Sequence, residues 1–232
     1  MHTQSFVVDA CADAVAHNFC LGCGLCALNC PSAAIVMEEQ AVHPGQTRKS
    51  PSLRPQLCVH CGRCAAVCPS GAIQQFHMEE LLHRVRATQS RAVAFFCLGL
   101  NVLAPSPLEQ GAVIEWGETG DTALMDARRR PRLQDVDAPQ GVLLETVRCT
   151  GRLGARLLWR LVLAGVRDMA FFACGSQSCQ YGRGGTGIAE HVAAVRSLLH
   201  AYGAHDIGLT VYEGVEAAKD IRLVLAALAP VG

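Results

Sequence analysis

The sequence has no excess of charge of either sign, since its 232 residues include 20 basic residues (Lys and Arg) and 20 acidic residues (Asp and Glu). Proteins that bind nucleic acid or an anionic membrane usually carry a basic surface, and this composition supports neither partner. The most apolar helical segment, residues 157–166, is interrupted by Arg160 and is far shorter than the ~20 residues of a membrane span. Residues 1–19 lack the basic and apolar regions of a secretory signal. These absences predict a cytoplasmic protein without a transmembrane segment.

The groupings that usually perform substrate chemistry are also missing. We recognise neither a Ser/His/Asp set nor a pair of carboxylates placed for acid–base work. No residue is therefore predicted to be catalytic.

Cysteine, by contrast, is abundant. The chain has 13 cysteines, an odd number, and most of them fall in regular runs, so a secreted disulfide framework is not expected. This usage indicates a reducing compartment. Cys11 lies outside every grouping described below, and we expect it to be a buried or free thiol.

Eight cysteines form two copies of the pattern C-x2-C-x2-C-x3-C-P, which is typical of bacterial iron–sulfur proteins. The first run contains Cys20, Cys23, Cys26 and Cys30, and the second contains Cys58, Cys61, Cys64 and Cys68. The copies also agree between the cysteines, as at Gly24 and Gly62, so the pattern is an internal repeat. These two glycines are predicted to adopt backbone angles beside the sulfur atoms that other residues avoid.

The spacing within each run has a chemical reason. Three closely spaced thiolates can bind three irons of a [4Fe-4S] cluster, and in two-cluster ferredoxins the fourth Cys of each run binds the other cluster. We therefore expect one cluster on Cys20, Cys23, Cys26 and Cys68, and a second on Cys30, Cys58, Cys61 and Cys64. Zinc is the main alternative, but zinc sites usually pair two short Cys units and do not need a third and fourth Cys at this spacing.

The remaining pattern predicts two domains. Residues 1–88 would be an α+β ferredoxin-like module, and residues 89–232 an α/β domain with a parallel sheet flanked by helices. We expect strands at residues 33–37, 72–76, 92–96, 111–116, 141–147, 168–173 and 207–212, and helices at 78–88, 153–164, 188–202 and 214–229. Residues 38–57, which contain three prolines and a glycine, are expected to form a loop.

A further group of cysteines follows the strands of the expected parallel sheet. Cys97, Cys149 and Cys174 each come just after a strand, and Cys179 lies in the same loop as Cys174. Because such strands end at one edge of the sheet, these four side chains should converge. Cys149 and Cys179 precede helices, whose N-termini favour thiolate. Four convergent thiolates suit a [2Fe-2S] cluster or zinc, and four buried cysteines without metal are the third possibility.

The residues around these cysteines resemble a known family. The segments Val147-Arg-Cys149-Thr-Gly151, Ala173-Cys174-Gly175 and Ser178-Cys179-Gln180-Tyr181 are similar to the delta subunit of methyl-viologen-reducing hydrogenase, over roughly residues 90–215. That resemblance implies a [2Fe-2S] cluster and electron transfer to heterodisulfide reductase. Leu98 and Leu100 stand where the family often has more cysteines, and Gln180 replaces its His.

The leading hypothesis is therefore an electron-transfer subunit of a multi-subunit oxidoreductase. Its expected partners are a flavin-containing subunit and a hydrogenase-, formate-dehydrogenase- or heterodisulfide-reductase-type catalytic subunit. The alternative is a self-contained flavin- or nucleotide-dependent oxidoreductase, because the glycine-rich residues 182–187 precede a helix and could bind a phosphate. We expect these glycines instead to form a flexible loop over the cluster, since they do not form the G-x-G-x-x-G pattern after a strand. A zinc-bound interaction scaffold is a third hypothesis.

A few single residues near the cysteines also have a predicted place. Arg152, Arg156 and Arg160 recur every fourth residue, which predicts one helix face that could also contact an acidic partner. His60 should pack near a cluster without binding it, and Tyr181 should either cover a cluster or fill the core.

Overall fold

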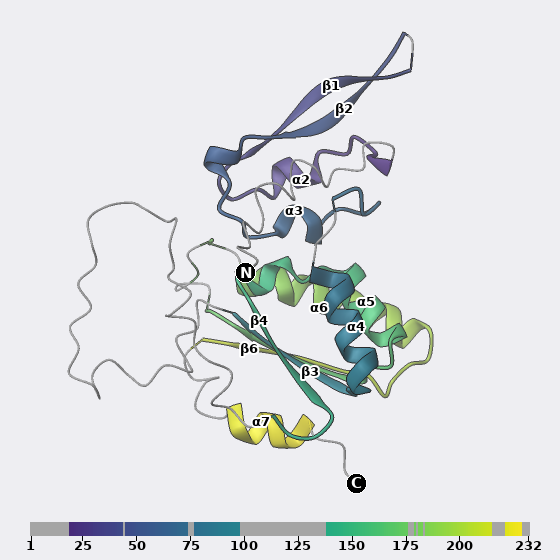
Figure 1. The fold of residues 1–232 in the computed structure, drawn as a ribbon, viewed down its shortest axis with the longest axis vertical. Helices are drawn as coiled ribbons and strands as arrows, with labels where there is room; N and C mark the ends of the chain where they lie inside the picture. Colours follow the sequence, from purple (N-terminus) through teal and green to yellow (C-terminus); the bar gives the residue numbers. More distant parts are fainter. Residues whose placement is uncertain are drawn as a thin grey trace, which may run out of the picture.

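The structure, a computed structural model, describes residues 19–43, 45–73, 77–97, 138–175, 179, 181–182, 184–214 and 221–228. Both cysteine runs lie beside a long hairpin at one end of the molecule, and the parallel sheet with its helices forms the other end (Figure 1). The strand expected at 111–116, most of the strand expected at 72–76, and Cys11 lie outside the described residues.

Each cysteine run contains one short helix that begins after a glycine. α2 (Leu25–Leu28) follows Gly24, and α3 (Arg63–Ala66) follows Gly62. The φ angles of the two glycines are +74° and +75°, in the left-handed region where a side chain is strained. The prediction for these glycines is confirmed, and the repeat in the sequence is a repeat in the structure. The short 3-10 helix η2 (Pro55–Leu57) leads into the second run.

A β-hairpin joins the two runs, so the expectation of a loop over residues 38–57 was wrong. β1 (Ile35–His43) pairs antiparallel with β2 (Gln46–Leu53). Pro51 lies within β2, which is possible because every strand of a two-stranded sheet is an edge strand and tolerates a missing N–H donor. Gly45, at φ +79°, lies between the two strands. The proline and glycine content that suggested a loop belongs to an edge strand and a turn.

The described strands of the second half form one parallel sheet in the order β4-β3-β5-β6. They are β3 (Ala92–Cys97), β4 (Val142–Val147), β5 (Asp168–Ala173) and β6 (Gly208–Glu213). The two central strands are almost entirely buried, as expected of strands covered on both faces. Phe95 stacks on Phe171, and Phe96 stacks on Phe172. The parallel sheet is confirmed, and each of these strands lies within a residue of its expected range.

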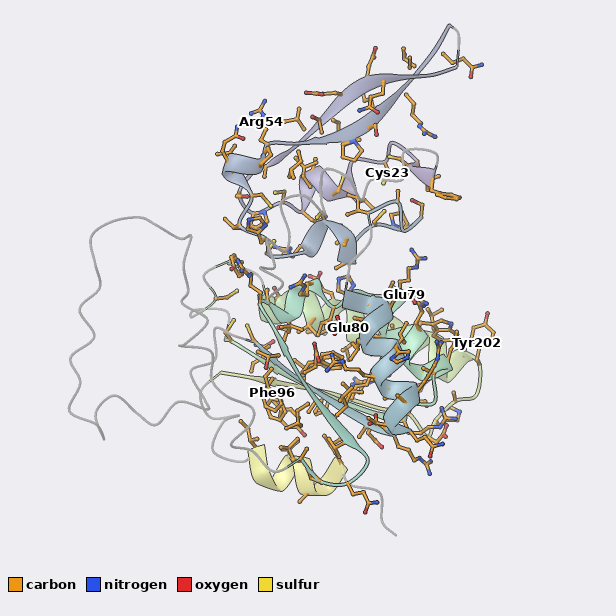
Figure 2. The ribbon with its side chains drawn as sticks, in the orientation of Figure 1. Cys23, Arg54, Glu79, Glu80, Phe96 and Tyr202 are labelled. Atoms are coloured by element: carbon orange, nitrogen blue, oxygen red, sulfur yellow. The ribbon has the colours of Figure 1, made fainter. Side chains whose placement is uncertain are left out.

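Helices cover both faces of this sheet (Figure 1). α4 (His77–Thr88), α5 (Ala155–Leu163) and α6 (Gly184–Ala201) share one buried core with Phe95. α7 (Ile221–Leu228) packs on the opposite face, which is the face of Phe96 (Figure 2). This layering is that of an α/β domain. None of the described helices is both long and apolar enough to cross a membrane.

Candidate metal centres

The first candidate centre is a cavity beside α2. The space inside it, including the part open to solvent, is about 320 Å³. Three cysteines of the first run and the last cysteine of the second run line it: Cys20, Cys23, Cys26 and Cys68. The other lining residues are mostly apolar and include Met37 and Pro51 of the hairpin and Ile73.

The second candidate centre is the counterpart of the first, with about 340 Å³ of space. Its cysteines are the last one of the first run and the other three of the second run: Cys30, Cys58, Cys61 and Cys64. His60 lines the same cavity, and its Nδ1 lies 3.8 Å from the sulfur of Cys58. The helical turn within each run carries the fourth cysteine to the neighbouring cavity, so each cavity draws cysteines from both runs.

Backbone N–H groups point at several of these sulfur atoms. The amide of Ala34 donates a hydrogen bond to the sulfur of Cys30 at 3.2 Å, and the amide of Gly22 donates one to Cys20 at 3.4 Å. These donors favour a negatively charged sulfur, as backbone amides do in anion-binding turns.

Cys68 accepts hydrogen bonds from several such donors. Burial raises the pKa of its thiol, but hydrogen bonds from the residues after it outweigh burial and lower the pKa overall. The donors are the Ile73, Ala72 and Gly71 amides and the Ser70 hydroxyl. A cavity with sulfur-only ligands, apolar walls and amide donors aimed at the sulfurs suits a [4Fe-4S] cluster.

The third candidate centre lies at the carboxyl edge of the parallel sheet. Cys97 ends β3 and Cys174 directly follows β5, and their sulfur atoms lie 3.7 Å apart. Cys149, two residues after β4, is fully buried, and its neighbours include the thiols of Cys97 and Cys179. Cys179 also lies within hydrogen-bonding reach of Cys174. The predicted convergence of the four cysteines is therefore confirmed.

The electrostatics of this third site differ from the expectation. Burial raises the pKa of Cys149 to about 12, and the amide of Gly151 only partly offsets it. The pKa of Cys174 is raised too, by its hydrogen bond with Cys97 and by burial. We expected helix N-termini to favour thiolate, but Cys149 precedes only the three-residue 3-10 helix η5 (Thr150–Arg152), so desolvation dominates. These thiols need a bound cation to become thiolates, which suits a metal centre that releases protons on binding.

The glycine-rich stretch packs against this third site. Residues from Gly184 onward form the first turn of α6, so the expectation of a flexible loop was wrong for them. An added Cβ at Gly185 would lie 3.0 Å from the carbonyl oxygen of Cys174, and one at Gly187 would lie 3.6 Å from the Cα of Gly151. Small residues here let α6 approach the cysteine loops.

The described cysteines do not surround a position for a single metal ion. Across the described ranges, no three Cys, His, Asp or Glu side chains meet the geometry of a site for one metal ion.

The arginines that recur every fourth residue contact the first half of the same chain. Arg152 packs against Gly62, and the guanidinium of Arg156 lies against Gly71. Arg160 forms a two-point ion pair with Glu79 of α4, one contact of which measures 3.0 Å, and Figure 2 shows Glu79 on the side of α4 near α5. The expected single helix face is correct only for Arg156 and Arg160, which lie on α5, because Arg152 ends the separate 3-10 helix η5. The surface that these arginines contact belongs to the same chain.

Comparison with known families agrees with this arrangement. A family model described as a 4Fe-4S dicluster domain matches residues 19–72, and a second model with the same description matches residues 50–101. The model of the methyl-viologen-reducing hydrogenase delta subunit matches residues 122–221. The chain joins a 4Fe-4S dicluster domain to a hydrogenase delta-subunit domain. No curated protein matches it.

The two domain types divide the candidate centres between them. The dicluster models span both cysteine runs and reach Cys97, and the delta-subunit domain contains Cys149, Cys174 and Cys179. The third site therefore takes its first cysteine from outside the matched delta-subunit segment. Both domain types support an iron–sulfur electron-transfer role for the chain.

Proposed function

We propose that this chain is an electron-transfer subunit with two [4Fe-4S] clusters and one [2Fe-2S] cluster. The pair of cavities that exchange their fourth cysteine carries the proposal, since crossed ligation is the arrangement of two-cluster ferredoxins. The ligands of one [4Fe-4S] cluster would be Cys20, Cys23, Cys26 and Cys68, and those of the other Cys30, Cys58, Cys61 and Cys64. Residues 1–88 would act as the ferredoxin-like domain and residues 89–232 as the [2Fe-2S] domain.

The [2Fe-2S] cluster is assigned to Cys97, Cys149, Cys174 and Cys179. Their convergence and the closeness of the Cys97 and Cys174 sulfurs support this assignment. The raised thiol pKa values of Cys149 and Cys174 mean that both groups are protonated when free, so a cluster that binds there would displace their protons.

The clusters supply one-electron chemistry when bound, and the protein sets their surroundings. The amides of Ala34 and Gly22 stabilise negative charge on the cysteine sulfurs. Apolar walls such as Met37 lower the polarity of the surroundings of the first centre. Both effects act on the reduction potential of a bound cluster.

The partners we propose are a flavin-containing subunit and a catalytic subunit of the hydrogenase, formate-dehydrogenase or heterodisulfide-reductase type. A hydrogenase delta-subunit domain supports membership of a multi-subunit complex. Apolar side chains around the first run are unusually exposed: Phe19 by 67%, Leu21 by 66% and Leu28 by 82%. An exposed apolar patch beside a redox centre suits the docking of a protein partner.

The function is tested by separating electron transfer from turnover. Full-length protein prepared without oxygen should be reduced by dithionite but should not oxidise NADH, hydrogen or formate. Adding the flavoprotein and catalytic subunits that co-purify with it should restore electron flow. Sustained turnover by the isolated chain would contradict the proposal, and bound flavin in the purified chain would favour a self-contained oxidoreductase.

A further inference from the structure

The second candidate centre and the third one meet at Arg152. This residue comes three positions after Cys149, at the end of η5. Its side chain lies along the backbone of Gly62, the residue after Cys61, where an added Cβ would be 3.0 Å from both the Cβ and the Nε of Arg152. Arg152 therefore spans the gap between the second cysteine run and the Cys149 loop.

Close backbone packing holds this contact in place. An added Cβ at Gly154 would lie 2.4 Å from the carbonyl oxygen of Ala66 and 2.7 Å from its Cα. Gly154 precedes α5 and Ala66 ends α3, so the segment after Cys149 rests directly on the helix of the second run. Such an approach between two backbones is open only to glycine.

The charges around Arg152 belong to both centres. Burial lowers the pKa of Arg152 most, and the nearby charge of Arg148 lowers it further. The opposing contributions come from the thiols of Cys61, Cys149 and Cys64, which are the neighbours from both sites. Arg152 is partly buried, and a partly buried cation between two redox centres interacts with both more strongly than a fully solvated one does.

We propose that Arg152 is a positioning residue that joins the second [4Fe-4S] centre and the Cys149 centre into one electron-transfer junction and raises the reduction potential of both. The inference rests on the proposed function, because it requires clusters at both sites. A fixed positive charge favours the reduced, more negative form of each cluster. In the transfer itself one electron leaves one centre and arrives at the other, and no proton moves and no bond changes.

The junction also orders the centres. Arg152 contacts the run that supplies Cys58, Cys61 and Cys64, and these residues line the second cavity. The first centre, on the side with the exposed Phe19 and Leu28, is the outer one. Electrons therefore pass between the outer centre and the Cys149 centre by way of the second [4Fe-4S] centre.

The test compares three full-length variants, each loaded with clusters and checked for iron content. Arg152→Gln removes the charge, and Arg152→Lys keeps it. Arg160→Gln is the control, because it removes an arginine charge on α5 that pairs with Glu79 instead. Redox titrations followed by electron paramagnetic resonance give the potential of each centre. Arg152→Gln should change the reduction equilibrium constant of the [2Fe-2S] centre and of one [4Fe-4S] centre at least about tenfold, which is a drop of 59 mV for a one-electron couple. The other [4Fe-4S] centre of Arg152→Gln should keep its wild-type potential. In Arg152→Lys and Arg160→Gln, all three centres should keep their wild-type potentials.

Unchanged potentials in an iron-replete Arg152→Gln protein would overturn the inference and leave the proposed function standing. Wild-type protein without iron–sulfur clusters would overturn the proposed function itself. If Arg152→Gln fails to retain its clusters, the junction is tested by the paramagnetic resonance spectrum of the reduced wild-type protein. Magnetic interaction between the reduced [2Fe-2S] centre and a single [4Fe-4S] centre supports the junction, and the spectrum of an isolated [2Fe-2S] centre refutes it.

Discussion

The sulfur atoms of Cys97 and Cys174 lie 3.7 Å apart although 77 positions separate these residues in the chain. The contact exists because β3 and β5 are adjacent parallel strands that end at the same edge of the sheet. Both side chains are buried, so two thiolates could not persist here without a cation. The strand pairing therefore brings two of the four proposed ligands side by side, which the spacing of either cysteine alone does not show.

Replacing Cys174 by Ala should remove the [2Fe-2S] cluster and leave both [4Fe-4S] clusters in place. Because ligation is coupled to folding, the variant should also lose stability in the parallel-sheet domain. Iron analysis with thermal unfolding measures both effects. Cys11→Ala is the control, since we predict that Cys11 binds no metal. A Cys174→Ala protein with the full wild-type iron content would show that this cysteine is structural.

Gly62→Ala should be more damaging than Gly24→Ala at the equivalent position of the repeat. Both glycines have φ near +75°, so each alanine costs ~1–2 kcal/mol of backbone strain. Only at Gly62 would the new Cβ also press on Arg152, whereas at Gly24 the nearest atom is 4.0 Å away. Chemical denaturation and iron content compare the two. Equal losses would mean that the Arg152 contact contributes nothing.

Gly154→Ala tests the contact between the two halves. The backbone of Gly154, at φ −76°, is accessible to any residue, so the effect should come only from the clash with Ala66. Overpacking of this kind costs ~1–3 kcal/mol. Faster limited proteolysis between the halves should accompany the loss of stability. Gly187→Ala is the matched control, because its Cβ would meet Gly151 at an ordinary contact distance of 3.6 Å. If both variants digest at the wild-type rate, the close packing is dispensable.

Much of the fold follows from local sequence signals. Continuous apolar runs such as residues 92–96 identify buried parallel strands, and strand ends then place Cys97 and Cys174 together. The hairpin was missed because Pro51 and Gly45 indicate a loop unless the strand is known to be an edge. The partner of a single side chain is harder still. Nothing local reveals that Arg152 meets Gly62, because that contact depends on how two distant segments pack.

Protonation of His191 should weaken the fold. Burial lowers the pKa of this α6 side chain, the charge of Arg63 lowers it further, and Glu190 opposes both. Because the folded pKa lies below the unfolded value of about 6.5, the unfolded state takes up the proton first. Stability should therefore fall as the pH drops below about 7, until the folded pKa is passed. His191→Gln should show a smaller decrease in melting temperature between pH 7.5 and 5.5, and an identical decrease would contradict this assignment.

Twelve cysteines of one chain are proposed to hold three iron–sulfur clusters. Iron, zinc and acid-labile sulfide should be counted in full-length protein purified without oxygen, and Mössbauer spectra should sort the iron by cluster type. We expect about ten irons per chain, roughly eight in [4Fe-4S] and two in [2Fe-2S] clusters, with matching sulfide. Zinc near one per chain with only eight irons would contradict a [2Fe-2S] cluster at the third centre. Four irons or fewer would contradict the two [4Fe-4S] clusters with crossed ligation.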